Sequence, residues 1–188
     1  MAGPFKKTEE LAAHACEVMS RQPGADARYG QYGKEYCALH YYSVEDAAYY
    51  LSYLSDIGGD GAGGSKYCTV PTSLHHLKEG EVIILGPGHT HSINMEMSHI
   101  DLGAGRAEGF SPLGPSRFFN ETTKRVWDRQ LYAFYRDTGG KCHAFSYNYA
   151  NRVVAALREG KWIPIGKAEG YWGSFKAFDG QDWELPSK

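Results

Sequence analysis

The stretch EVIILGPGHTHSINMEMSHID, from Glu81 to Asp101, is the segment that decides how this chain is interpreted. Its first five residues, Glu81–Leu85, form a compact β-branched run, which predicts a buried strand. Gly86-Pro87-Gly88 predicts the end of that strand, because proline has no backbone N–H and fits poorly inside a sheet. Two histidines follow at once, so the sequence predicts a polar site at the end of a buried strand.

Those histidines, His89 and His91, stand two residues apart, so both side chains point the same way on an extended backbone. Neutral imidazoles bind zinc at about 2.0–2.1 Å, and Asp101 can supply an oxygen ligand from the segment that follows. Three protein ligands and one open position are typical of a catalytic zinc site. We therefore predict that His89, His91 and Asp101 hold one catalytic zinc ion.

Two further residues are candidates for the chemistry. Glu35 opens a predicted strand, where the sheet can place it beside the metal as a general base. Ser98 can donate a hydrogen bond to the oxyanion that forms in the transition state. The alternative needs no metal, since a lone His-x-His pair also arises by chance as polar residues at a strand end. A strand, a Gly-Pro-Gly break, HTH and SxxD in one short window favour the metal site.

The rest of the chain predicts a mixed architecture. Thr8–Ser20 has the apolar spacing of an amphipathic helix, and Arg117–Arg129 is interpreted as a second helix. Glu35–Tyr42 predicts an early strand, and Leu131–Arg136 and His143–Tyr147 predict two late strands joined by a glycine-containing hairpin turn. A helix followed by strands interleaved with helices predicts an α/β or α+β fold around a central sheet.

Composition excludes several classes of function. The 188 residues predict one domain, and a net charge of −2 gives no nucleic-acid footprint. No apolar run has the length of a signal peptide or a membrane span. We therefore expect no nucleic-acid or membrane partner, and either a cytoplasmic location or secretion by a specialised system without a signal peptide. The four cysteines occur singly, without a CxxC pair, which favours reduced and mostly buried thiols.

The order of Glu35, His89-Thr90-His91 and Ser98-His99-Ile100-Asp101 resembles the signature of the JAMM (MPN or JAB) metalloprotease family. The resemblance implies a central mixed β-sheet flanked by helices. It implies zinc ligands at His89, His91 and Asp101, a general base at Glu35 and an oxyanion-stabilising serine at Ser98. It also implies cleavage of peptide or isopeptide bonds in a protein or peptide substrate.

The chain is more closely similar to the JAB-like domains at the C-termini of bacterial polymorphic toxins. Lys34-Glu35-Tyr36, Gly88–His91, Phe110-Ser111-Pro112 and Asp137–Gly140 match parts of those domains. The resemblance covers residues 8–166 and leaves a C-terminal extension of residues 167–188 within one domain. It implies a secreted toxin or effector domain with a cognate immunity protein as a partner.

The sequence departs from the family pattern in two places. The spacer from His91 to Asp101 is one residue short, and Ser111 competes with Ser98 as the family serine. If Ser111 takes that role, Gly114 falls where the third ligand should stand, and Asp101 must fill the gap from the preceding loop. An inactive JAB-like protein-binding domain is therefore an alternative to an active enzyme.

A cupin-type metal enzyme is the other alternative. Lys78-Glu79-Gly80-Glu81, followed by VIILGPGHTH, resembles a cupin's glycine turn, strand and histidines, and Glu96 falls where that motif places an acidic ligand. No second histidine motif follows at a cupin's spacing. The choice between Asp101 and Glu96 as the third ligand separates the two interpretations.

Overall fold

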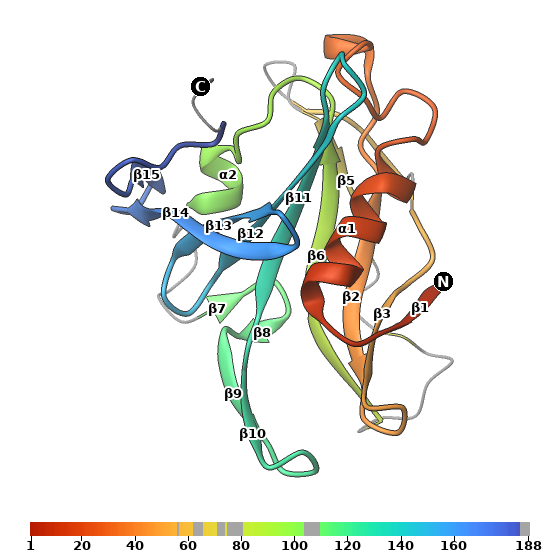
Figure 1. Ribbon diagram of the computed structural model, residues 1–188, viewed down its shortest axis with the longest axis vertical. Helices are drawn as coiled ribbons and strands as arrows, with labels where there is room; N and C mark the ends of the chain where they lie inside the picture. Colours follow the sequence, from red (N-terminus) through yellow and green to blue (C-terminus); the bar gives the residue numbers. More distant parts are fainter. Residues whose placement is uncertain (56, 62–65, 71–73, 75–80, 104–109, 185–188) are drawn as a thin grey trace.

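The protein is built on one nine-stranded mixed sheet, seen in a computed structural model that describes residues 1–55, 57–61, 66–70, 74, 81–103 and 110–184 (Figure 1). Neighbouring strands are antiparallel, except for β6 and β11, which run parallel. The prediction of a central mixed sheet is confirmed. In spatial order the strands are β1 (Ala2–Phe5), β3 (Ala48–Leu51), β2 (Cys37–Ser43), β6 (Val82–His91), β11 (Gln130–Arg136), β12 (Cys142–Asn148), β13 (Val153–Arg158), β14 (Lys161–Glu169) and β15 (Ser174–Ala177).

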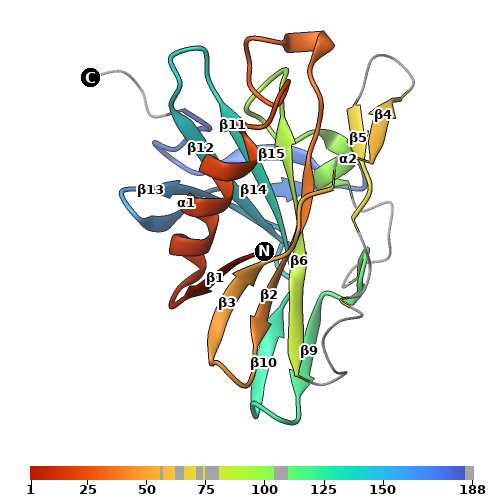
Figure 2. The same ribbon diagram turned by 90° about the vertical axis from the view of Figure 1, so that its right-hand side faces the viewer.

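Helices are few among the described residues. Helix α1 (Thr8–Met19) agrees with the predicted amphipathic helix, whereas α2 (His99–Leu102) and the 3-10 helix η1 (Gly30–Tyr32) are single turns. Figures 1 and 2 show α1 on one face of the sheet and α2 on the other. No helix in this described part of the chain is long and apolar enough to cross a membrane.

Each face of the sheet has its own apolar core. On the first face, Leu11, Ala15 and Met19 of α1 pack against Tyr132 and Phe134 of β11. The opposite core contains the alternate residues of β11 and β12 together with residues near α2. The period-2 alternation of a strand therefore divides β11 between the two cores.

The C-terminal extension completes the sheet. Strand β15 is its edge, and Trp183 is buried with its ring 5.1 Å from Phe145 and 4.5 Å from Phe175. The sequence showed no pattern here, because this tail is polar apart from scattered aromatics. Its order comes from long-range pairing and from one buried indole.

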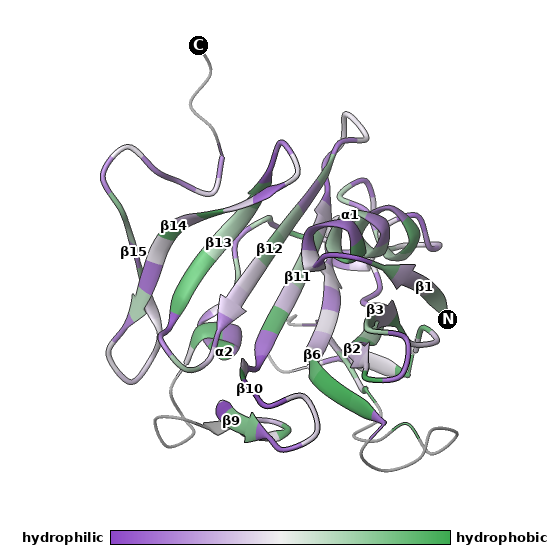
Figure 3. Ribbon diagram, turned by 60° about the horizontal axis from the view of Figure 1, so that its bottom comes forward, coloured by the Kyte–Doolittle hydropathy of each residue, from purple (hydrophilic) through white to green (hydrophobic). Residues whose placement is uncertain are grey.

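Strand β6 does not end at Gly86-Pro87-Gly88, so the predicted break is wrong. The strand runs from Val82 to His91, and Figure 3 shows strongly hydrophobic residues at its start. A register shift opposite His40 and Tyr41 accommodates the irregular segment, and pairing with β11 begins only at Gly88. Gly86 permits a close approach, because a Cβ there would lie 1.6 Å from the carbonyl oxygen of Gln130.

The predicted helix Arg117–Arg129 is also wrong, since this segment is a β-hairpin of β9 (Arg117–Asn120) and β10 (Arg125–Asp128). The Asn120 side chain accepts hydrogen bonds from the backbone N and Oγ1 of Thr123, which stabilises the turn instead of a helix. Trp127 is buried with Ile83 and Leu85 at the base of the hairpin. The same apolar spacing is compatible with a helix and with a β-hairpin, and the tertiary contacts of Trp127 favour the hairpin.

Two smaller hairpins border the site. β4 (Gly58–Asp60) pairs with β5 (Lys66–Cys68), and β7 (Phe110–Ser111) pairs with β8 (Gly114–Pro115). The prediction of four reduced cysteines is contradicted, because disulfides join Cys16 to Cys142 and Cys37 to Cys68. The partners are 126 and 31 residues apart, so only the folded topology reveals the pairing.

Candidate metal centre

The pairing of β2 with β6 places an acidic residue beside the two histidines. Cys37 lies opposite His89, and the N–H of Thr90 donates to the carbonyl oxygen of Tyr36 at 3.1 Å. The Tyr36 N–H donates in turn to Thr90 Oγ1 at 3.0 Å. Because alternate residues share a face, this register puts Glu35 on the same side as His89 and His91.

Asp101 reaches the histidines from the single-turn helix α2. Ser98 is its N-cap, and its Oγ accepts from the Asp101 N–H at 3.2 Å. The backbone N–H and the Oγ of Ser98 each donate to Asp101 Oδ2 at 2.8 Å. This reciprocal capping box fixes the orientation of the carboxylate.

Three ligand-type atoms converge where these elements meet. His89 Nε2 and His91 Nε2 lie 2.8 Å apart, and Asp101 oxygens lie 3.3 Å from the first and 3.6 Å from the second. Ligand atoms around a tetrahedral zinc ion stand about 3.3 Å apart, given bonds of about 2.0–2.1 Å. The nitrogen–nitrogen distance is within about 0.5 Å of that value, and so are the two nitrogen–oxygen distances, which end on Oδ1 and Oδ2 of Asp101 respectively. With one ligand atom from each residue, all three lie within 4.8 Å of one another, so the group can hold one metal ion.

The charges of the cluster reinforce one another. Burial alone would lower the pKa of His89, but the Asp101 carboxylate and Glu35 reverse this effect and raise it. Burial opposes ionisation of Asp101, yet His89 and His91 hold the pKa of that carboxyl well below its ordinary value. Burial raises the pKa of Glu35, and the two histidines only partly offset the shift. An ionised Asp101 and a more basic Glu35 suit the roles of ligand and proton acceptor.

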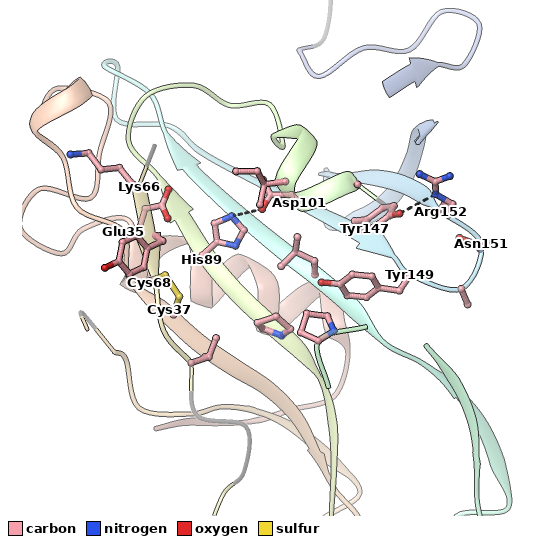
Figure 4. Close-up of a pocket in the computed structure, with 18 of the residues that line it drawn as sticks. Glu35, Cys37, Lys66, Cys68, His89, Asp101, Tyr147, Tyr149, Asn151 and Arg152 are labelled. Carbon is pink, nitrogen blue, oxygen red and sulfur yellow. Dashed lines mark hydrogen bonds and ion pairs between the residues drawn. A yellow bond between two sulfur atoms is a disulfide. The ribbon is translucent and has the colours of Figure 1, made fainter. Parts of the chain in front are cut away.

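Two members of the cluster, His89 and Asp101, line an open pocket of about 530 Å³ (Figure 4). Glu35, His89 and Asp101 line one part of it, and Lys66, Tyr67 and Cys68 form the adjoining wall. The Cys37–Cys68 disulfide fastens β5 to β2 at this point. Substrate-sized molecules can therefore approach the side of the cluster that the protein does not cover.

The two candidate serines have different environments. The Ser98 hydroxyl is engaged with Asp101, so in this arrangement it positions a ligand, and its oxyanion role stays a prediction. Ser111 is buried, and its Oγ donates to the Gly114 carbonyl oxygen at 3.1 Å and accepts from the Leu113 N–H at 3.1 Å. Ser111 does not line the pocket, although its neighbour Pro112 does.

Glu96, the acidic ligand of the cupin interpretation, is exposed and does not belong to the group formed by His89, His91 and Asp101. His91 Nδ1 is buried and has no hydrogen-bond partner in the described part of the chain. Nε2 is thus the only nitrogen of this ring that contacts the cluster in the described residues.

Sequence reasoning missed the residues at the other end of the pocket. Tyr147, Tyr149, Asn151, Arg152 and Lys167 line it from β12, from β14 and from the turn between β12 and β13. They lie far from the histidine motif in sequence and form no short motif of their own. Only the order of strands in the sheet brings them to the pocket.

This chain matches no protein-family model, no curated protein and no solved structure. The interpretation of the site therefore depends on its own geometry and chemistry.

Proposed function

We propose that this protein is a zinc-dependent peptidase or isopeptidase with His89, His91 and Asp101 as its metal ligands. The observation that carries the proposal is the convergence of one ligand atom from each of these residues within 4.8 Å, beside an open pocket that His89, Asp101 and Glu35 line. A bound zinc ion supplies a Lewis acid that polarises a carbonyl and activates water at neutral pH. The resemblance to JAMM proteases supports the same assignment.

The side chains divide the remaining work. Glu35 accepts a proton from the attacking water and delivers it to the leaving amine, because its carboxylate lies in the same pocket and is not a ligand. Ser98 holds Asp101 through two hydrogen bonds of 2.8 Å, which keeps the third ligand oriented toward the histidines. The open pocket leaves room for a peptide on the uncovered side of the cluster.

The two disulfides bear on where the protein acts. Disulfides persist in oxidising environments and are rare in reducing ones. They support the expectation of a secreted toxin or effector domain over a cytoplasmic location. A protein or peptide substrate and a cognate immunity protein are the partners that this role implies.

Metal content tests the proposal directly. We expect about one equivalent of zinc in the purified protein and its loss in His89→Ala and Asp101→Ala. His143→Ala is a matched control, because His143 also pairs with a carboxylate, Asp137 at 3.0 Å, but belongs to no three-residue group among the described residues. Glu35→Gln should keep zinc and lose about 10²–10⁴-fold of the hydrolysis of peptide or isopeptide substrates.

Each failure has a separate meaning. A wild-type protein without metal after zinc loading would refute the proposal. Retention of metal in Asp101→Ala together with its loss in Glu96→Ala would support the cupin alternative. Stoichiometric zinc with no hydrolysis of either bond type would support an inactive binding domain.

A further inference from the structure

The pocket continues away from the metal ligands toward two cations. Figure 4 shows Arg152 and Asn151 at the opposite end from Glu35 and His89, with Tyr147 and Tyr149 between the two ends. Arg152 lies in the turn between β12 and β13, and Lys167 lies on β14, opposite Val153. Arg152 and Lys167 therefore come from neighbouring segments of the sheet, and both line the pocket.

The Arg152 guanidinium is held in a fixed orientation. Its Nη2 donates to the carbonyl oxygens of Gly170 at 2.8 Å and Leu102 at 3.3 Å, and its Nε donates to Tyr147 Oη at 3.3 Å. Leu102 is the residue after Asp101, so this network connects the guanidinium to the helix that carries the third metal ligand. A preorganised guanidinium loses little entropy when it binds a planar anion.

Neither cation has a carboxylate partner within the described ranges. All three hydrogen-bond acceptors of Arg152 are neutral, and neither Arg152 nor Lys167 forms an ion pair with a described residue. The Arg152 Nη1 donates to no described residue, which leaves its two N–H donors for a ligand. A half-buried arginine and a lysine nearby, both without counter-charges among the described residues, favour an anion.

The sheet sets the distance between this end and the metal cluster. His89 is on β6, and β13 is three strands further along, which corresponds to roughly 14 Å at about 4.8 Å per strand. An extended peptide advances about 3.3 Å per residue, so about four residues span this length. Tyr147 and Tyr149 lie along the way and can contact the intervening side chains.

We propose that Arg152 and Lys167 bind a carboxylate of the peptide substrate, about four residues from the bond that is cleaved. This inference rests on the proposed peptidase function and adds a substrate class to it. The carboxylate belongs either to the chain terminus or to an Asp or Glu side chain. Both sources present the same planar anion to the guanidinium.

Binding can be measured separately from catalysis in zinc-loaded Glu35→Gln. The probes are three libraries of N-acetylated hexapeptides: one with free carboxyl termini, one amidated, and one amidated and lacking Asp and Glu. Peptides retained in equilibrium dialysis are counted by mass spectrometry. We expect at least tenfold weaker retention of the third library, and the contrast between the first two identifies the source of the carboxylate.

Variants of the two cations test the assignment. Arg152→Met and Lys167→Met in the same background should each reduce retention of carboxylate peptides about tenfold, and Arg152→Lys should recover part of it. Lys161→Met is the matched control, because Lys161 is also exposed on β14 but does not line the pocket. Metal content should be unchanged in every variant. If Arg152 only held α2 in place, Arg152→Met would displace Asp101 and lower the metal content.

The two proposals fail in different ways. Equal retention of all three libraries, or retention that is unchanged in both Arg152→Met and Lys167→Met, would overturn the carboxylate site. Carboxylate-dependent retention without hydrolysis by the wild-type protein would overturn the peptidase function and leave the anion site standing.

Discussion

The two faces of the central sheet carry similar residues in opposite settings. Each face has at least one buried histidine and one disulfide: His40 and Cys16–Cys142 on the side of α1, and His91, the half-buried His89 and Cys37–Cys68 on the side of the pocket. His40 is fully buried, and its ring stacks on Tyr132 with centroids 4.3 Å apart. Both His40 ring nitrogens lack a partner within the described part of the chain.

The surroundings of each histidine determine whether it can bind a metal ion. Desolvation alone lowers the pKa of His40 to about 3, so this ring stays neutral and packs in the core as an apolar side chain does. On the pocket face a carboxylate and a second imidazole lie within 3.6 Å of the ligand nitrogens. A histidine becomes a candidate ligand where the fold adds an acidic partner and access from solvent.

The largest expected contrast concerns the disulfides. The bond on the helix face spans 126 residues and the bond on the pocket face spans 31. In the chain-entropy model these correspond to about 5 and about 4 kcal/mol of unfolding free energy. We expect Cys16→Ala/Cys142→Ala to lose more stability in urea unfolding than Cys37→Ala/Cys68→Ala.

The zinc content of the same two double variants separates the faces. The helix-face variant should keep its metal wherever it remains folded, because α1 packs on the face of the sheet opposite the proposed ligands. The pocket-face variant frees β5 beside the site and should bind zinc more weakly. Unchanged stability in both variants would contradict the presence of these disulfides in the folded protein.

The sequence anticipated the features that local spacing determines. Two-residue spacing predicted that His89 and His91 share a face, and the SxxD segment led to Asp101. Features set by long-range pairing were not accessible. The register of β2 against β6 places Cys37 opposite His89, and no local signal identifies Cys68 as its partner.

The hairpin at Arg117–Asp128 shows that local spacing can also predict the wrong element. Apolar residues occupy positions 118, 119, 126 and 127, a spacing that suits one face of a helix as well as two paired strands. Asn120 stabilises the turn, and Trp127 finds its partners on β6, far away in the sequence. Tertiary packing therefore overrode the local preference.

A smaller effect tests how the pocket face holds its carboxylate. Ser98→Ala removes a hydroxyl that donates to Asp101 Oδ2 at 2.8 Å, and residues that orient a ligand commonly contribute 10–100-fold to metal affinity. We expect zinc affinity, measured by competition with a chelator, to fall by that factor without being lost. Ser98→Thr should retain most of the affinity, since it keeps the hydroxyl.

Ser111→Ala provides the matched comparison for the two serines. Ser111 bonds only within its own short hairpin among the described residues, so its loss should leave zinc affinity unchanged. If Ser111→Ala weakened zinc binding and Ser98→Ala did not, Ser111 would be the serine that supports the metal site, and the assignment of Asp101 would need revision.

An effect of comparable size belongs to the helix face and depends on pH. The pKa of His40 is about 3 in the folded protein and about 6.5 when unfolded, so the unfolded chain binds a proton first as the pH falls. Stability is therefore complete above pH 6.5 and declines as the pH falls toward 3, by about 2 kcal/mol between pH 7 and pH 5. Tyr132 is the only titratable ring stacked on His40 in the described structure, and burial raises its pKa well above the ordinary value, so it stays neutral throughout this range.

His40→Leu isolates this contribution from the other titrating groups. The difference in unfolding free energy between wild type and variant should shift by about 2 kcal/mol in the variant's favour from pH 7 to pH 5. At pH 7 leucine should cost little, because it replaces a ring whose nitrogens are unpaired in the described residues. A difference independent of pH would mean that His40 is hydrated or paired in the folded protein, and the contrast between the two faces would then be one of degree.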